Sequence, residues 1–172
     1  PANETQFPKN WQELNAGTWK AFEEIYASGR AKAIGVSNFN TNHLTALFET
    51  AIVKPMVNQI EFHPGHSQVE LGQFCLAHNL LIQAWSPLGS GRILNNDLIV
   101  SLAKKYAVSV GQICINYCLA KGTLPLPRSS SEQNIEANLA STHFELSQED
   151  VQLIDEMPAD GFSGLNPSTV EF

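Results

Sequence analysis

Polar and aromatic side chains end three of the short apolar runs in this 172-residue chain. The first run ends in Ser37 and Asn38, a later run ends in Trp85, and the last ends in Arg128. Amide and hydroxyl groups can hydrogen-bond a carboxamide, an indole offers a flat stacking face, and a guanidinium binds a phosphate through two parallel hydrogen bonds. Together these groups suit a planar aromatic ligand that also carries an amide and a phosphate.

A further apolar run carries polar residues at Asn58, Gln59, Glu61 and His63. If the runs are parallel strands, their carboxyl ends meet on one rim, where parallel α/β folds build their ligand sites. A structural explanation is also open, because polar residues end strands in every α/β protein as the chain enters solvated loops. Asn58 and Glu61 in particular could be hydrogen-bonded groups with a structural role.

The elements that would position these residues alternate between strands and helices. Apolar runs of strand length occupy residues 31–39, 56–62, 80–85 and 123–130. Helical spacing of the apolar residues predicts helices over residues 11–29, 40–51, 67–79, 96–106, 109–122, 131–141 and 147–158. The Pro and Gly content of SPLGSG, residues 86–91, indicates a loop.

Several helix starts carry residues that can cap the free backbone N–H groups of a first turn. Asn40 can cap the second helix, and Ser109 with Gln112 forms a capping box at another. Ser67 with Glu70 predicts a capping box for the helix that ends near residue 79.

Each expected strand is followed by a helix, and nearly continuous apolar strands of this kind form parallel sheets covered by helices. Four such units fit either an open doubly wound sheet or half of an eight-stranded barrel, and the pattern alone does not choose. No linker or composition break divides the chain, so residues 1–172 are interpreted as a single domain.

The charge balance restricts the partners. A net charge of −7 and a pI of about 5.1 argue against nucleic acid or an anionic membrane, which require clustered Lys and Arg. No apolar run approaches the roughly 20 residues of a membrane span, and the first residues, PANETQFPKN, lack the features of a signal peptide. We therefore expect a cytoplasmic protein that has neither nucleic acid nor membrane as a partner.

The cysteines at Cys75, Cys114 and Cys118 all fall in expected helices. Their odd number and the lack of a signal peptide indicate a reducing compartment. Cys114 and Cys118 share a helix face at a spacing of four, but no His or further Cys lies at ligand spacing. We expect buried helix cysteines and no metal site.

Five stretches of the chain resemble the aldo-keto reductase family, in the family's order and spacing. They are AIGVSNFN at 33–40, KPMVNQIEFHP at 54–64, AWSPLGSG at 84–91, LPLPRSSSEQNIEANL at 124–139 and ELSQEDVQLID at 145–155. The resemblance covers nearly the whole chain. It implies a parallel (β/α) barrel of the TIM type, of which this chain would be about four C-terminal βα units, a half barrel. It also implies an oxidoreductase that reduces aldehydes and ketones with NADPH.

The resemblance assigns residues to a nicotinamide cofactor. Ser37, Asn38 and Gln59 would hold the nicotinamide carboxamide, and Trp85 stands where the family stacks an aromatic ring, usually Tyr, on the nicotinamide. The resemblance places the remaining contacts, in order along the chain, at Ser86, Leu88, Ser90, Arg128, Ser129 and Asn138. The first three lie in the loop that covers the pyrophosphate, the next two lie beside the adenosine 2′-phosphate, and the last contacts adenine.

Two positions depart from the family's pattern at the adenosine end. Asn134 stands where the family often has Arg, and Ala137 stands where it often has Glu. Losing a cation beside a dianionic phosphate weakens the preference for NADP, and Arg128 in place of the family's Lys offsets part of that loss. The expected cofactor is NADP(H), with NAD(H) as the alternative.

The residues that the family uses for catalysis do not match any position of this chain. Hydride reduction of a carbonyl needs a proton donor beside the forming alkoxide, and the family uses a Tyr together with Lys, Asp and His. Tyr26, Tyr106 and Tyr117 all fall in expected helices, and no Asp ends a strand. Pro1 resembles the Pro that follows the family's catalytic His, so the chain would begin just after it. His63 is the weak alternative donor, because the family does not use the His at this place.

A half barrel exposes two strand edges and its inward-facing apolar residues, so we expect self-association through those edges. Two hypotheses follow. The chain is either part of an aldo-keto reductase whose complete form reduces small carbonyl substrates, or a catalytically inactive half barrel that binds cofactor or associates with itself. The carbonyl substrate is not readable from these residues, although the short tail, residues 161–172, favours an open pocket.

Overall fold

The structure, a computed structural model, describes residues 10–168. Its four parallel strands form one sheet in chain order, β1 (Gly35–Ser37), β2 (Val57–Glu61), β3 (Leu81–Trp85) and β4 (Leu124–Leu126). The expected parallel α/β sheet of four βα units is therefore confirmed. Pro1, expected to follow the family's catalytic His, lies outside the described residues.

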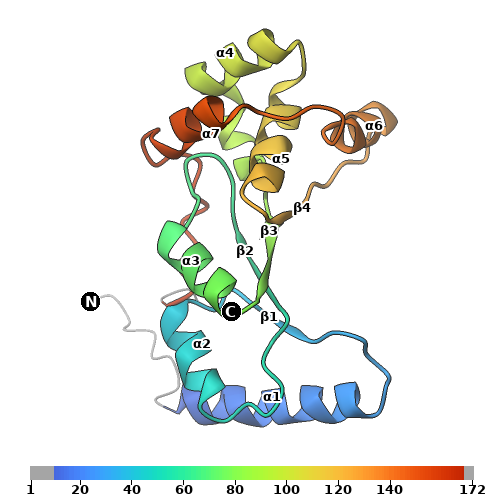
Figure 1. Cartoon of the computed structure of the whole chain (residues 1–172), viewed down its shortest axis with the longest axis vertical. Coiled ribbons are helices and arrows are strands. Elements are labelled where there is room, and N and C mark those ends of the chain that lie inside the picture. Colours follow the sequence, from blue (N-terminus) through green and yellow to red (C-terminus); the bar gives the residue numbers. More distant parts are fainter. Residues whose placement is uncertain (1–9, 169–172) are drawn as a thin grey trace, which may run out of the picture.

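The helices lie where the apolar spacing predicts them, with tighter ends. Their bounds are α1 (Trp11–Ala27), α2 (Thr41–Phe48), α3 (Val69–Ala77), α4 (Asp97–Tyr106), α5 (Val110–Ala120), α6 (Glu132–Ala140) and α7 (Gln148–Asp155). Figure 1 shows α1 and α2 together on the β1 side of the sheet, and α4 to α7 gathered on the β4 side. The sheet thus joins two groups of helices, with α3 between them.

Two of the three expected helix caps are confirmed. Asn40 accepts a hydrogen bond from the backbone N–H of His43, and Ser109 forms a capping box with Gln112. The box expected at Ser67 is wrong, because Gln68 is the residue that precedes α3, with a left-handed backbone at φ 44°. The Gln68 side chain donates instead to the carbonyl oxygen of Glu61, which ties the start of α3 to the end of β2.

The two outer strands are shorter than the sequence predicts. β1 and β4 have three residues each, although apolar runs of eight or nine residues surround them. Each pairs with a neighbour on one side only, so few residues gain ladder hydrogen bonds. Gly35 in β1 allows a close approach, since a Cβ there would lie 2.6 Å from the carbonyl oxygen of Val57.

The loop expected over residues 86–91 is partly helical. A 3₁₀ helix, η1 (Gly89–Asn95), begins within it and contains a kink, because Ser90 and Gly91 have positive φ angles of 53° and 88°. This kink follows the carboxyl end of β3 directly. It places a strained backbone next to the rim where the site residues gather.

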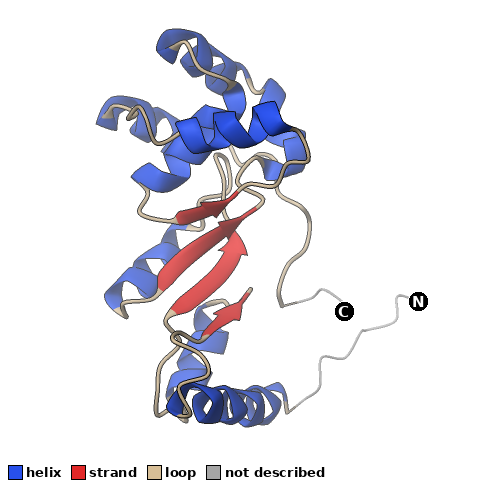
Figure 2. Ribbon diagram, turned by 90° about the vertical axis from the view of Figure 1, so that its right-hand side faces the viewer, coloured by secondary structure: helices blue, strands red, loops and turns tan. Residues whose placement is uncertain are grey.

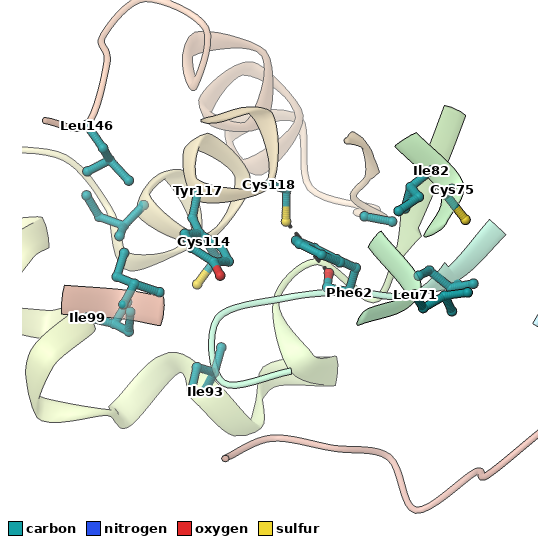
Figure 3. Packing of buried hydrophobic residues seen from close by; sticks show 14 of the residues in the cluster. Phe62, Leu71, Cys75, Ile82, Ile93, Ile99, Cys114, Tyr117, Cys118 and Leu146 are labelled. Carbon is teal, nitrogen blue, oxygen red and sulfur yellow. Dashed lines mark hydrogen bonds between the residues drawn. The ribbon is translucent and has the colours of Figure 1, made fainter. Parts of the chain in front are cut away.

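The core joins the sheet to the α4–α7 group of helices. Phe62, just after β2, is 2% exposed and stacks on Tyr117 of α5 with ring centroids 6.1 Å apart. Cys118 donates through its sulfur to the carbonyl oxygen of Phe62 at 3.6 Å, the dashed contact in Figure 3. Cys75, Cys114 and Cys118 are all buried free thiols in helices, as expected.

The two faces of the sheet are covered differently. Ile60 and Ala84 face the helices and are at most 2% exposed. The alternate residues Leu81 and Leu124 face the other side and are each 43% exposed. Figure 2 shows helices to the left of, above and below the red strands, and a loop of the C-terminal segment along their right side. This second face, called the open face below, corresponds to the interior of a closed barrel.

In the described part of the chain, no single helix is long and apolar enough to cross a membrane. α4 and α5 reach the required length and composition only as a pair, and they are bent by 92° at the break between them.

The buried thiols and phenol of α5 predict a loss of stability in alkali. Burial raises the pKa of Cys114 from its ordinary value of 9.0 to about 12. Burial, followed by the hydrogen bond to Asp155, raises the pKa of Tyr117 above its ordinary value of 10.0. These groups ionise at a lower pH in the unfolded chain than in the folded chain. The free energy of unfolding is therefore unaffected by them below about pH 9 and decreases as the pH rises above that value. Thermal midpoints measured from pH 8 to 11 should fall. Tyr117→Phe should flatten the decline and Tyr26→Phe should not; equal slopes in all three proteins would contradict this account.

Candidate cofactor-binding site

Two predicted site residues, Ser37 and Gln59, lie with Gln83 in one polar row across the open face. The register places Ser37 beside Gln59, and Gln59 beside Gln83. The Ser37 hydroxyl donates to the backbone carbonyl of Gln59 at 3.1 Å, and the Gln59 amide donates to the Gln83 side chain at 3.0 Å. The row therefore presents amide and hydroxyl groups on the open face.

Asn38 and Trp85 are joined directly at the carboxyl ends of β1 and β3. The Trp85 indole N–H donates to the Asn38 side-chain oxygen at 2.8 Å, across 47 residues of sequence. Asn38 has a positive φ of 57°, and its backbone N–H donates to Gln59 at 2.8 Å. This left-handed conformation turns the Asn38 side chain towards Trp85. Because only its side-chain oxygen is used in that hydrogen bond, its amide NH₂ can bind a ligand.

Asn58 has the structural role that the sequence left open. It is fully buried on the helix side of β2, donates to the carbonyl of Phe39 at 2.8 Å and accepts from the Phe39 N–H at 3.4 Å. These two bonds hold the turn that follows β1. Asn58 thus supports the backbone that carries Asn38.

The loop after β3 brings Ser86 and Ser90 together. Their hydroxyl oxygens lie 2.8 Å apart, and both residues have positive φ angles, of 52° and 53°. The side chain of Leu88 packs instead against the core. It lies so close to Gly111 that a Cβ added to that glycine would be 3.3 Å from the Leu88 side chain. Any contact that Leu88 makes with a ligand would therefore come from its backbone.

Arg128, Ser129 and Asn138 line a separate open cavity of roughly 630 Å³ between α5, β4 and α6. Its walls are largely apolar, with Leu124 and Leu139 among them. The Ser129 hydroxyl accepts from the backbone N–H of Ser131, at the start of α6, at 3.0 Å. The predicted residues thus form three groups along the rim, and none of the cavities in the described range contains all of them.

His63 is enclosed. It is fully buried, with Nδ1 2.8 Å from the carbonyl oxygen of Pro64 and Nε2 3.3 Å from a carboxylate oxygen of Glu61. Both ring nitrogens therefore already have partners.

A contact of Glu61 with Ser163 was not predicted, since nothing in the sequence relates residues 102 positions apart.

Tyrosine, lysine and aspartate do meet in this structure, but in the helical layer rather than at the rim. Tyr117 donates to Asp155 at 2.6 Å, and Lys121 pairs with the same carboxylate at 2.8 Å. These contacts join α5 to α7. The raised pKa of Tyr117 makes its phenol a poorer acid, the opposite of what proton donation requires.

A second group of the same residue types joins α4 to α7. Asp150 accepts from Tyr106 and from Lys105, and Ser147 completes the group at 2.9 Å. These hydrogen bonds hold the pKa of Asp150 below its ordinary value, Lys105 contributing most. Within residues 10–168, no three His, Cys, Asp or Glu side chains come together as a metal site.

Comparison with known proteins decides the family, because the model of the aldo/keto reductase family matches residues 5–159. The chain belongs to the aldo/keto reductase family. A glyoxal reductase of Bacillus subtilis is 42% identical over 155 residues, which are 90% of this chain and 56% of that reductase. A 9,11-endoperoxide prostaglandin H2 reductase of Trypanosoma cruzi is 42% identical over 87% of this chain and 54% of its own length.

Solved structures of aldo-keto reductases agree with the fold. The apoform of Gox0644 superposes with a TM-score of 0.89 at 38% identity, covering 97% of this chain and 62% of that one. A mutant of Gox0644 in complex with NADPH gives the same TM-score at 37% identity. This aldo-keto reductase chain therefore spans about half the length of the curated relatives it matches, and its sheet corresponds to part of a barrel.

Proposed function

We propose that this chain carries the cofactor-binding half of an NADPH-dependent carbonyl reductase. In the complete protein, aldehydes or ketones would be reduced to alcohols. The observation that carries the proposal is the hydrogen bond between Trp85 and Asn38, which fixes a stacking face and an amide side by side at the strand ends. The similarity to a structure that holds NADPH supports the same assignment.

The residues at the nicotinamide end match the chemistry of a nicotinamide. The free amide hydrogens of Asn38 can donate to the carboxamide oxygen, while the side-chain oxygens of Gln59 and Ser37 can accept from the carboxamide NH₂. Stacking on Trp85 would leave one face of the nicotinamide open, and so fix which hydride is transferred. When bound, the cofactor supplies that hydride to the carbonyl carbon; the protein residues only orient it.

The other groups would hold the remainder of NADP(H). We assign the pyrophosphate to Ser86, Ser90 and the backbone of Leu88. We assign the adenosine with its 2′-phosphate to Arg128, Ser129 and Asn138, which share one cavity. Position 134 is Asn and not Arg, so the preference for NADP(H) over NAD(H) would rest mainly on Arg128.

The chain alone is expected to bind cofactor without turnover. In the described residues Tyr26 lies in α1, and Tyr106 and Tyr117 donate to carboxylates that tie helices together. None of these phenols lies beside Trp85, where an alkoxide would form. The proton donor would therefore come from residues that correspond to the rest of the relatives' barrel.

The test is a titration of the purified chain with NADPH, followed by tryptophan fluorescence. Wild type should show quenching, and Trp85→Phe should lose most of it. NADPH oxidation with a nitrobenzaldehyde should stay at background. Absence of quenching in wild type would overturn the cofactor assignment, and turnover would overturn the account of the missing donor.

A second role, self-association, is favoured by the open face. Leu81, Leu124 and Leu126 are 41–43% exposed there, and the outer edges of β1 and β4 have no strand partner in the described structure. Apolar surface of this kind is normally covered by another protein surface. Sedimentation velocity across a concentration series should show dimers or larger species; a sharp monomer throughout would contradict the role.

A further inference from the structure

Glu61 is almost completely buried although it lies on the open face of the sheet. It is the last residue of β2, pairs in register with Trp85, and is only 3% exposed. The cover is the C-terminal segment, residues 160–168, which Figure 2 shows running along that side of the sheet. Ser163 of this segment donates to the two Glu61 oxygens, its N–H at 2.9 Å and its hydroxyl at 2.5 Å.

His63 closes the same cluster from the other side. Its two ring nitrogens face the oxygens of Pro64 and Glu61, so both nitrogens have partners within the cluster. Gly161 packs on this ring, and a Cβ there would lie 3.1 Å from it. The carboxylate, the imidazole and the segment therefore form one packed unit.

Other hydrogen bonds also hold the segment, and one of them is partly buried, because Arg92 donates to the carbonyl oxygen of Gly161 at 2.9 Å. Asn96 donates to Asp160 at 3.2 Å, and Asn40 donates to Ser168 at 2.9 Å, both at exposed positions. The bonds at Glu61 are charge-assisted and lie in a buried place, where such bonds are stronger. Glu61 is therefore the attachment that ties the segment to the strand end at Ser163, beside the attachment of Gly161 to Arg92.

The segment also borders the nicotinamide end of the proposed site. One cavity of roughly 350 Å³ is lined by Asn38, Glu61 and Trp85 from the sheet, and by Phe162 and Leu165 from the segment. The surroundings of the Trp85 ring therefore depend on where the segment lies.

We propose that Glu61 is a positioning residue, which fixes the C-terminal segment through Ser163 and thereby sets the orientation of Trp85. The attachment itself is independent of any ligand. The consequence for nicotinamide stacking rests on the proposed function.

The attachment is tested by hydrogen exchange on the whole chain without cofactor. Glu61→Gln keeps the size of the side chain but replaces one acceptor oxygen with a donor. Exchange in residues 161–166 should accelerate about 10-fold or more, as expected for losing charge-assisted bonds, while amides of α5 stay protected. Ser163→Ala leaves the Glu61–His63 pair intact and should give a smaller increase in the same residues. Ser168→Ala is the control and should leave residues 161–164 unchanged. Unchanged exchange in both Glu61→Gln and Ser163→Ala would overturn the proposal.

The positioning of Trp85 needs its own readout. In protein labelled with 5-fluorotryptophan, the ¹⁹F resonance of Trp85, identified by its absence in Trp85→Phe, should shift in Glu61→Gln and in Ser163→Ala. The Trp19 resonance should not shift. Faster exchange with an unmoved Trp85 resonance would overturn the positioning role and leave a purely structural tether.

The same variants separate this inference from the cofactor assignment. If wild type binds no NADPH, the proposed function fails, while the exchange and fluorine results still decide the role of Glu61. If wild type binds NADPH, Glu61→Gln should show a shallower quench at saturation, because the Trp85 ring is less well oriented. An equal quench would contradict the link to stacking.

Discussion

Arg128→Ala should weaken NADPH binding about 10- to 100-fold and leave NADH binding within about threefold. A hydrogen bond to a charged group contributes about 1.5–3 kcal/mol, which corresponds to that range. In the structure the Arg128 side chain is exposed at the mouth of the cavity shared with Ser129 and Asn138. None of the ion pairs within residues 10–168 engages it, so its guanidinium is free to bind a phosphate.

The measurement is isothermal titration calorimetry with NADPH and NADH on each variant. Arg30→Ala removes another exposed arginine, which lies outside the cavity, and controls for the change in net charge. An equal loss for both cofactors would show that Arg128 contacts something other than the 2′-phosphate. No loss for either would remove Arg128 from the site.

Phe62→Ala should lower the free energy of unfolding by about 3–5 kcal/mol, the range for truncating a fully buried aromatic ring. Phe62 is 2% exposed, and it fills the junction where the end of β2 meets α5. Removing the ring would leave a cavity between the sheet and the α4–α7 helices, and Tyr117 would lose its stacking partner.

Urea unfolding followed by circular dichroism measures this loss. Phe22→Ala, at a ring that is 40% exposed, is the matched control and should cost clearly less. If Phe62→Ala does not fold, Phe62→Leu provides a milder test, with an expected loss of about 1 kcal/mol. A loss at Phe62 no larger than the loss at Phe22 would mean that the junction is not a core.

Local signals predicted the order of the elements well, because each depends on neighbours in sequence. Asn40 and Ser109 lie next to the N–H groups they cap, so their spacing sufficed. Ser67 failed because the backbone turns at Gln68, whose side chain binds the distant carbonyl of Glu61. The lengths of β1 and β4 were overestimated because the apolar runs do not reveal that these strands pair on one side only.

The site was predictable to a different extent at its two ends. The polar strand ends identified residues that the structure brings together, since Trp85 donates a hydrogen bond to Asn38. Ser163 could not have been found, because its role depends on a segment folding back onto a strand 102 residues earlier. The ligand contacts themselves remain predictions, to be tested by the titrations above.

The sheet's two edges differ, and this limits the ways in which copies can join. The edge of β1 can pair with the edge of β4 of another copy, but not with itself in the same parallel sense, so such a contact is head-to-tail. Head-to-tail contacts end only when the rotation from one copy to the next closes a ring. If the curvature of two sheets brings the second pair of edges together, a discrete two-chain particle results. If it does not, every added copy presents a fresh edge and the product is an open-ended fibre. The geometry of strand twist, more than the strength of any single contact, would decide between the two.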